Sequence, residues 1–157
     1  MHKALRGGFI FGLTSAVTTT LGLMVGLNSG THSKLVVTGA IITIAIADAF
    51  SDSLGMHLSE ESENIKERAI WEATLSTFFT KLLFPLTFLI PVLLFSLTNA
   101  IIISIAWGMS CIAFFSYMIA KIRNKKPLIV IAEHLLIAVI VVVAAHYFGG
   151  LVSQFFA

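Results

Sequence analysis

The sequence predicts an all-α integral membrane protein with five transmembrane helices. Hydrophobic residues make up 57% of the chain and charged residues only 11%, with a mean hydropathy of +0.97, whereas soluble domains are about 25% charged. Five separate apolar stretches each reach the roughly 20 residues that a membrane-spanning helix needs. The basic residues form short clusters between these stretches. This pattern excludes a soluble globular enzyme, a disordered chain and a disulfide-stapled secreted module, and it argues against a nucleic-acid partner.

We expect a single transmembrane domain, residues 1–157, with spans at about 8–27, 35–57, 73–97, 99–120 and 127–148. Lys3 and Arg6 resemble the start of a signal peptide, but the apolar stretch after them is too long and lacks a small-x-small cleavage site. Pro85 and Pro91 predict a bend in the third span. Residues 59–72 continue the helical pattern of the second span without Gly or Pro. They predict a short helical extension into the cytoplasm, followed by a turn.

The positions of Lys and Arg predict the orientation. With a cytoplasmic N-terminus, Lys34 alone lies in an outside segment, and eight basic residues lie in inside segments: Lys3, Arg6, Lys66, Arg68, Lys121, Arg123, Lys125 and Lys126. This asymmetry favours an N-in, C-out topology. We expect the protein in a prokaryotic cytoplasmic membrane, with the lipid bilayer as its surroundings.

Four ionisable residues lie inside the predicted spans: Asp48, Asp52, Lys81 and Glu133. Such residues cost about 2.5–3.5 kcal/mol each at the centre of a helix, so each one suggests a function. Asp48 and Asp52 are four residues apart and therefore share a helix face. We expect this pair to bind a metal ion and to exchange protons, with Glu133 also serving proton coupling. Lys81 either neutralises a carboxylate or extends toward the membrane surface.

The face that carries the two aspartates continues through Met56, Glu60 and Glu63 toward the cytoplasm. Carboxylates suit hard divalent cations, and a thioether adds preference for transition metals. We expect the glutamates to collect cations and the aspartates to bind them. Three alternatives remain open: aspartates that only bond neighbouring helices, a packing role for the methionine, and a merely solvated glutamate face.

The first span has hydroxyl side chains near its middle and two glycine pairs at four-residue spacing, Gly8 with Gly12 and Gly22 with Gly26. Small residues let helices approach closely, and hydroxyls bond across the contact. We expect a helix–helix interface here, either within the chain or in a dimer. We also expect the span to line an ion pathway through Ser15, Thr18 and Thr19.

Three stretches carry a recognisable pattern: FGLTSAVTTTLGLMVGL (11–27), SDSLGMHLSEESE (51–63) and AKIRNKKPLIVIAEHLLIA (120–138). Together they resemble the vacuolar iron transporter family and its bacterial and archaeal relatives. The resemblance implies a homodimer with its pathway between the first spans. It also implies export of Fe²⁺ or a similar metal from the cytosol in exchange for protons, and metal ligands on the first two spans and the cytoplasmic extension.

The chain departs from the family pattern at several positions. Ser15 stands where the family usually has an aspartate, Asp52 stands where it usually has a methionine, and the cytoplasmic hairpin is cut to residues 59–72. Acidic charge has in effect moved from the first span to the second. A site richer in oxygen and poorer in sulfur shifts the expected preference toward manganese.

The leading hypothesis is therefore a transporter of divalent transition-metal ions, Fe²⁺ or Mn²⁺, that exchanges metal for protons. No permanently bound cofactor is expected. Two other classes remain open: a non-transporting membrane scaffold with the same fold, and a transporter of another cation. An enzyme is not expected, because no nucleophile–base arrangement and no H-E-x-x-H spacing is present in the sequence.

Overall fold

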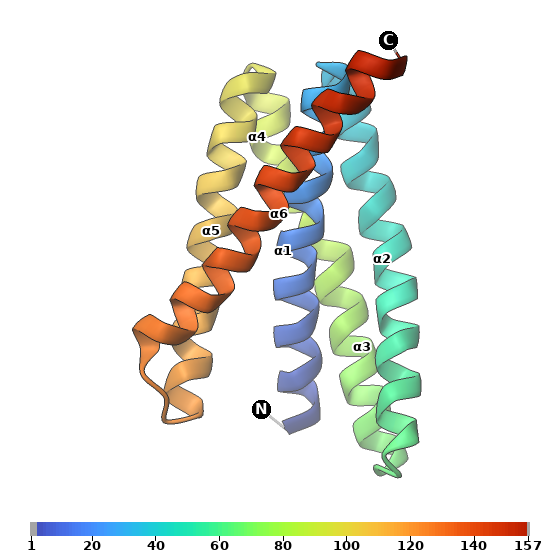
Figure 1. The fold of residues 1–157 in the computed structure, drawn as a ribbon. Helices are drawn as coiled ribbons and strands as arrows, with labels where there is room; N and C mark the ends of the chain where they lie inside the picture. The colour runs from blue at the N-terminus through green and yellow to red at the C-terminus, as the bar shows by residue number, and fades with distance from the viewer. Residues whose placement is uncertain (1–2, 157) are drawn as a thin grey trace.

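A computed structural model describes residues 3–156 as a bundle of helices (Figure 1). The helices, in chain order, are α1 (Lys3–Thr31), α2 (Lys34–Ser62), α3 (Glu67–Leu83), the 3₁₀ turn η1 (Pro85–Phe88), α4 (Leu89–Leu94), α5 (Leu97–Ile122) and α6 (Pro127–Phe156). The expectation of an all-helical fold is confirmed over this range.

Five helical segments are long and apolar enough to cross a membrane when α3, η1 and α4 are taken together as one span, Glu67–Leu94. The expected number of spans is therefore confirmed. Helices α1 and α6 have 29 and 30 residues and extend beyond the spans expected at about 8–27 and 127–148. Residues with left-handed backbone follow three of the helices: His32, Asn64 and Asn124, with φ of 49°, 52° and 52°.

The helical extension expected at residues 59–72 is divided in two. Helix α2 ends at Ser62, residues 63–66 form a turn, and Glu67 already begins α3. The amide of Glu63 bonds back to Glu60 O at 3.3 Å, and Asn64 then takes a left-handed conformation that stops the helix. Asparagine tolerates this conformation better than most residues. The end of α2 and the start of α3 together form the short hairpin at this end of the bundle.

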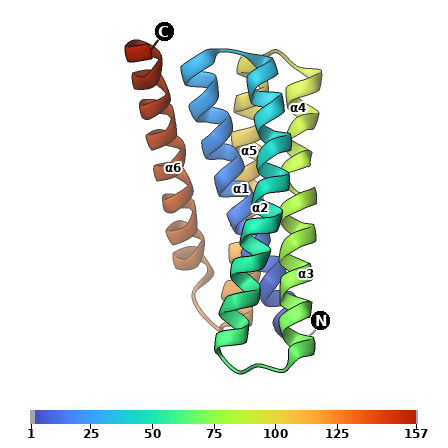
Figure 2. The same cartoon turned by 90° about the vertical axis from the view of Figure 1, so that its right-hand side faces the viewer.

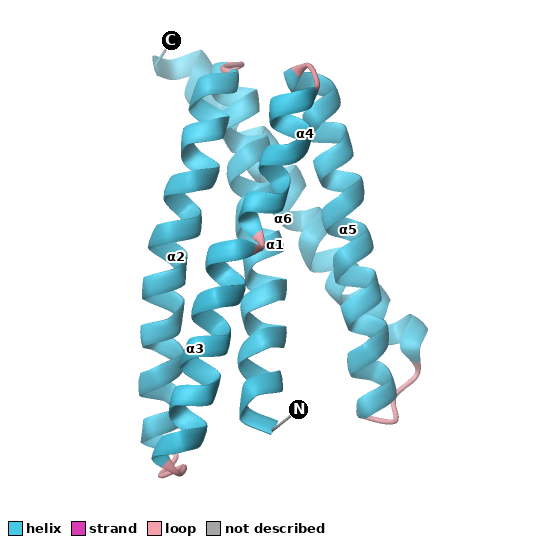
Figure 3. Cartoon of the chain, turned by 180° about the vertical axis from the view of Figure 1, so that it is seen from behind, coloured by secondary structure: helices cyan, strands magenta, loops and turns pink. Residues whose placement is uncertain are grey.

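The third span is interrupted near its middle, where the sequence predicts a bend. Helix α3 ends at Leu83, and a 3₁₀ turn follows from Pro85 to Phe88. Proline has no N–H to continue the α-helical bonding, so the helix stops before it. Pro91 lies in the first turn of α4, where proline is tolerated. Figure 3 shows the interruption as a short loop between α3 and the turns that lead to α4.

Helix α1 is the centre of the bundle. It contacts α2, α3, α5 and α6, and Figures 1 and 2 show the other helices arranged around it. The N-terminus lies at the same end as the α2–α3 and α5–α6 turns, and the C-terminus lies at the opposite end (Figure 1). Helix α6 stands at the edge of the bundle (Figure 2) and buries only Val130 and Ala138 among its described residues. Most of its surface is therefore available to lipid.

Both glycine pairs of α1 pack against helices of the same chain. A Cβ at Gly8 would collide with the carbonyl oxygen of Ala73 in α3. A Cβ at Gly26 would lie 3.4 Å from Ala145 O in α6, and one at Gly149 would collide with Gly26 O. The predicted helix–helix interface thus exists, and α3 and α6 occupy it. Of the two alternatives for this interface, the structure shows the contact within the chain. The expected homodimer stays a prediction.

Candidate functional site

A completely buried lysine lies between two carboxylates in the middle of the bundle. Lys81 of α3 has 0% of its side chain exposed. Its Nζ lies 2.6 Å from Asp48 Oδ2 and 2.8 Å from Asp52 Oδ2, both on α2, and 3.0 Å from Ser15 Oγ on α1. Three helices thus bring one cation and three oxygen atoms to a single point.

Two hydroxyls of α1 complete this cluster. Ser15 Oγ donates to Asp52 Oδ2 at 3.1 Å, and Thr19 Oγ1 donates to Asp48 Oδ2 at 3.0 Å. Asp48 therefore accepts hydrogen bonds from Lys81 and Thr19. Asp52 accepts from Ser15 and, at 3.4 Å, from Ser51 Oγ, and it forms an ion pair with Lys81. We refer to Asp48, Asp52, Lys81, Ser15 and Thr19 as the Asp–Lys–Asp cluster.

Helix geometry explains how the sequence produces this arrangement. Asp48 and Asp52 project from one face of α2 because they are four residues apart, as are Ser15 and Thr19 on α1. The glycines Gly8 and Gly12 bring α3 close to α1 one to two turns away, which lets Lys81 reach between α1 and α2. The sequence left two positions open for Lys81, at the membrane surface or beside a carboxylate. In the structure, Lys81 lies beside the carboxylates of Asp48 and Asp52.

The cluster carries a formal charge of −1 when all three ionisable groups are charged, because two carboxylates outweigh one ammonium. Asp48 and Asp52 are largely shielded, with 17% and 26% of their side chains exposed. A buried charge is tolerated only when it is paired and hydrogen-bonded, and here each one is. The remaining negative charge makes the cluster attractive to one additional cation.

The remaining members of the predicted metal stripe do not join this cluster. Met56 is half-buried further along α2. Glu60 and Glu63 lie at the end of the helix and line a cavity of about 500 Å³ together with Lys3 and Arg6. A helix rises 1.5 Å per residue, so Asp48 and Glu63 are separated by roughly 22 Å and cannot share an ion. Within residues 3–156, no group of three or more His, Cys, Asp or Glu side chains is placed to hold a metal.

Glu133 is also remote from the cluster. It is exposed on α6 and lines a cavity of about 260 Å³ with Lys125 and Lys126, near the α5–α6 turn. In the described part of the chain, Glu133 forms no hydrogen bond or ion pair with Asp48 or Asp52. Its expected part in proton coupling stays a prediction, and any such role must act from a separate location.

The predicted pathway residues line a groove beside the cluster. Ser15, Thr18 and Thr19 form part of one wall of a cavity of about 410 Å³ between α1, α5 and α6. The opposite wall includes His134 of α6, whose Nδ1 lies 2.7 Å from Ser116 Oγ on α5. This opposite wall could not be predicted from the sequence, because the tilt of α6 relative to α1 is a tertiary property.

The other membrane histidines are also paired with hydroxyl groups. His57 Nδ1 lies 3.1 Å from Thr74 Oγ1, and its ring packs against Trp71 with centroids 4.9 Å apart. His146 Nδ1 forms a short hydrogen bond with Ser29 Oγ. These contacts join α2 to α3 and α1 to α6, so they are explained as structural links between helices.

No protein-family model matches the chain, and no curated protein sequence matches it. The resemblance to the vacuolar iron transporter family therefore rests on the three quoted stretches and stays a prediction. The Asp–Lys–Asp cluster has to be interpreted from its own geometry.

Proposed function

We propose that the protein is a membrane transporter that exchanges a divalent metal ion for protons at the Asp–Lys–Asp cluster. The observation that carries the proposal is the position of Lys81 Nζ, which has oxygens of Asp48, Asp52 and Ser15 within 2.6–3.0 Å. An ammonium group is itself a cation. Oxygens that surround it form a place where a mobile cation can bind once the lysine moves away or loses its proton.

The charge balance gives a mechanism for exchange. With a protonated Lys81 the cluster has a charge of −1. If Lys81 releases its proton and a divalent ion takes the position between Asp48 and Asp52, the cluster becomes neutral. Metal binding and protonation then compete for the same groups, which is the physical basis of coupling. Oxygen donors favour harder ions such as Mn²⁺, and the family resemblance adds Fe²⁺.

The proposed orientation rests on the distribution of the basic residues. Lys34 lies at one end of the bundle, and the turns that carry the other loop lysines and arginines lie at the opposite end. We infer that the basic end faces the cytoplasm. Glu60 and Glu63 line a cavity at that end together with Lys3 and Arg6, and the proposal gives these two carboxylates the first contact with a cation that enters from the cytoplasm. Together with the resemblance, this supports export from the cytosol by a homodimer in a prokaryotic cytoplasmic membrane.

Two specific observations support the alternatives. Every charge of the Asp–Lys–Asp cluster already has a partner within the chain, as expected for a membrane scaffold that uses the cluster only for stability. The charge of −1 is also matched by one monovalent cation bound beside a lysine that stays protonated. The experiment has to separate these two cases from metal exchange.

The test is uptake of Mn²⁺ and Fe²⁺ into proteoliposomes with a metal-sensitive dye inside, with and without an imposed pH gradient. The variant replaces both aspartates, Asp48→Asn with Asp52→Asn. The matched control replaces two exposed carboxylates, Glu61→Gln with Glu67→Gln, which removes the same charge far from the cluster. We expect the proton gradient to drive metal flux in the wild type and the control, and the aspartate variant to lose it.

Flux that persists in a well-folded aspartate variant would overturn the proposal. Absence of metal flux in the wild type, combined with Na⁺-dependent dissipation of the pH gradient, would support the monovalent alternative. Absence of both, with a lower unfolding temperature in the aspartate variant, would support the scaffold.

A further inference from the structure

A wedge-shaped groove separates α1 from the α5–α6 hairpin at the end of the bundle that carries the N-terminus. Helix α6 meets α1 closely near Gly149 and Gly26, and Figure 1 shows it leaning away from α1 toward its own first residues. The resulting cavity of about 410 Å³ is within the usual range of about 300–1,000 Å³ for small-molecule sites. Its apolar lining consists of Ile10, Phe11, Ile112, Ile119 and Ile137.

This groove is accessible from the surface that faces lipid. Phe11 is 41% exposed and Ile137 is 56% exposed. Water makes no hydrogen bonds with apolar walls, whereas a hydrocarbon chain fills such a space and makes dispersion contacts along it. An acyl chain is therefore the natural occupant of the apolar part.

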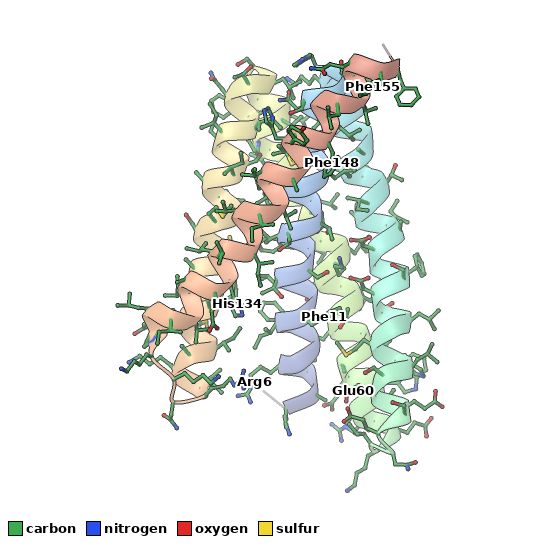
Figure 4. The ribbon with its side chains drawn as sticks, viewed as in Figure 1. Arg6, Phe11, Glu60, His134, Phe148 and Phe155 are labelled. Atoms are coloured by element: carbon green, nitrogen blue, oxygen red, sulfur yellow. The ribbon has the colours of Figure 1, made fainter. Side chains whose placement is uncertain are left out.

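Basic residues lie one or two helical turns beyond the lining, toward the end of the bundle. Arg6 precedes Ile10 by four residues on α1 and therefore shares its helix face. Arg123 directly follows α5, four residues after Ile119, and Lys126 directly precedes α6, eight residues before His134. Figure 4 shows Arg6 on the side of α1 that faces the α5–α6 hairpin.

The charge at this mouth is predominantly positive. The α5–α6 region contributes Lys121, Arg123, Lys125 and Lys126, and α1 contributes Lys3 and Arg6. The acidic groups nearby are Glu133, beside Lys125 and Lys126, and Glu60 and Glu63, which share a cavity with Lys3 and Arg6. Within residues 3–156, none of these basic residues forms an ion pair. They are thus free to contact an anionic group.

We propose that this groove binds one anionic phospholipid, with an acyl chain along the isoleucine-lined wall and the phosphate between Arg6 and the basic α5–α6 turn. Guanidinium groups bind phosphate oxygens in a bidentate way, and basic pockets between membrane helices recognise anionic headgroups. The acyl chain would lie beside Ser15 and Thr19 and would cover the groove side of the Asp–Lys–Asp cluster. The lipid site depends on the groove and its charges, and it does not depend on transport.

The test is native mass spectrometry of the full chain in detergent, titrated with dioleoylphosphatidylglycerol or with the zwitterionic dioleoylphosphatidylcholine. The headgroup variant is Arg6→Gln with Arg123→Gln. Its matched control is Lys66→Gln with Arg68→Gln, at the same end of the bundle but on α3. The groove variant is Ile137→Trp, and its control is Ile140→Trp, which is equally exposed on α6 but does not line the groove.

We expect the wild type to bind one phosphatidylglycerol more tightly than phosphatidylcholine. The headgroup variant should lose roughly 25-fold in affinity, since each basic residue near an anionic lipid contributes about fivefold. Arg6→Lys with Arg123→Lys should keep part of the preference, because lysine keeps the charge but loses the bidentate contact. Ile137→Trp should weaken binding of both lipids. The two control variants should match the wild type, and size-exclusion chromatography shows whether each variant is folded.

Equal affinity for the two lipids in the wild type would overturn the proposal. The same loss of affinity in the Lys66 and Arg68 control would overturn it as well, because the effect would then be a general charge effect. If Ile137→Trp dissociates a dimer while the lipid stays bound, a second copy of the chain occupies the groove instead.

Discussion

Lys81 and Asp48 form the shortest ion pair in the described part of the chain, with Nζ 2.6 Å from Oδ2, although they are 33 residues apart and lie on different helices. Asp52 adds a second carboxylate at 2.8 Å. Because the lysine is fully buried, its charge is balanced by these groups rather than by water. The ion pair therefore holds α2 against α3, and it also occupies the position proposed for cation binding.

Removal of the lysine charge should destabilise the protein strongly. Lys81→Met leaves two neighbouring carboxylates without their shared cation, and breaking a buried pair in this way costs about 3–5 kcal/mol. The lower unfolding temperature can be measured by circular dichroism in detergent.

The control for this prediction removes all three charges. The triple variant Asp48→Asn, Asp52→Asn, Lys81→Met has no uncompensated charge, so it should recover much of the lost stability. A triple variant that is less stable than Lys81→Met alone would contradict the idea that charge balance stabilises this region.

Ser15→Asp should increase the affinity for divalent metal. The hydroxyl of Ser15 lies 3.0 Å from Lys81 Nζ, so an aspartate at this position adds a third carboxylate to the same point. We expect binding of Mn²⁺, measured by calorimetry at pH 7.5, to strengthen about tenfold, which is about 1.4 kcal/mol. Ser15→Asn has a similar shape without the charge and serves as the control. Equal affinity in the two variants would mean that the position does not contact the ion.

Two glycines that are neighbours in the sequence should respond differently to the same substitution. A Cβ at Gly149 would collide with the backbone of Gly26, whereas a Cβ at Gly150 meets nothing within 4 Å. Gly149→Ala should therefore push α6 away from α1 and cost about 1–3 kcal/mol. Gly150→Ala should be neutral or slightly stabilising, because alanine favours helix. Thermal unfolding of both variants checks this, and equal effects would show that the two helices are not in close contact.

Glu133→Gln should leave equilibrium metal binding at the Asp–Lys–Asp cluster unchanged, because Glu133 is exposed on α6 beside Lys125 and Lys126. If Glu133 serves proton coupling from its separate location, the variant should lose the pH dependence of transport while keeping metal affinity. Calorimetry and proteoliposome flux at pH 6 and pH 8 measure the two quantities. A variant with both properties unchanged would remove Glu133 from the mechanism.

The sequence by itself determined the number of spans and the existence of the aspartate pair. Hydrophobic length is a local property, so five apolar stretches were enough to predict five membrane-crossing segments. The spacing of Asp48 and Asp52 was enough to place them on one face, because the helix repeat is fixed. The pattern predicted a helical extension and a turn at residues 59–72 but did not locate the turn, which follows Ser62 and contains the left-handed Asn64.

Only the tertiary structure decided which residues meet. Lys81 could have extended to the membrane surface, and its position between two carboxylates depends on α3 packing against α1 at Gly8 and Gly12. The crossing of rigid helices likewise determines which residues the α1 glycines contact. It also determines the groove that forms where α6 leans away from α1. Crossing angles depend on side chains far apart in the chain, and no local period in the sequence encodes them.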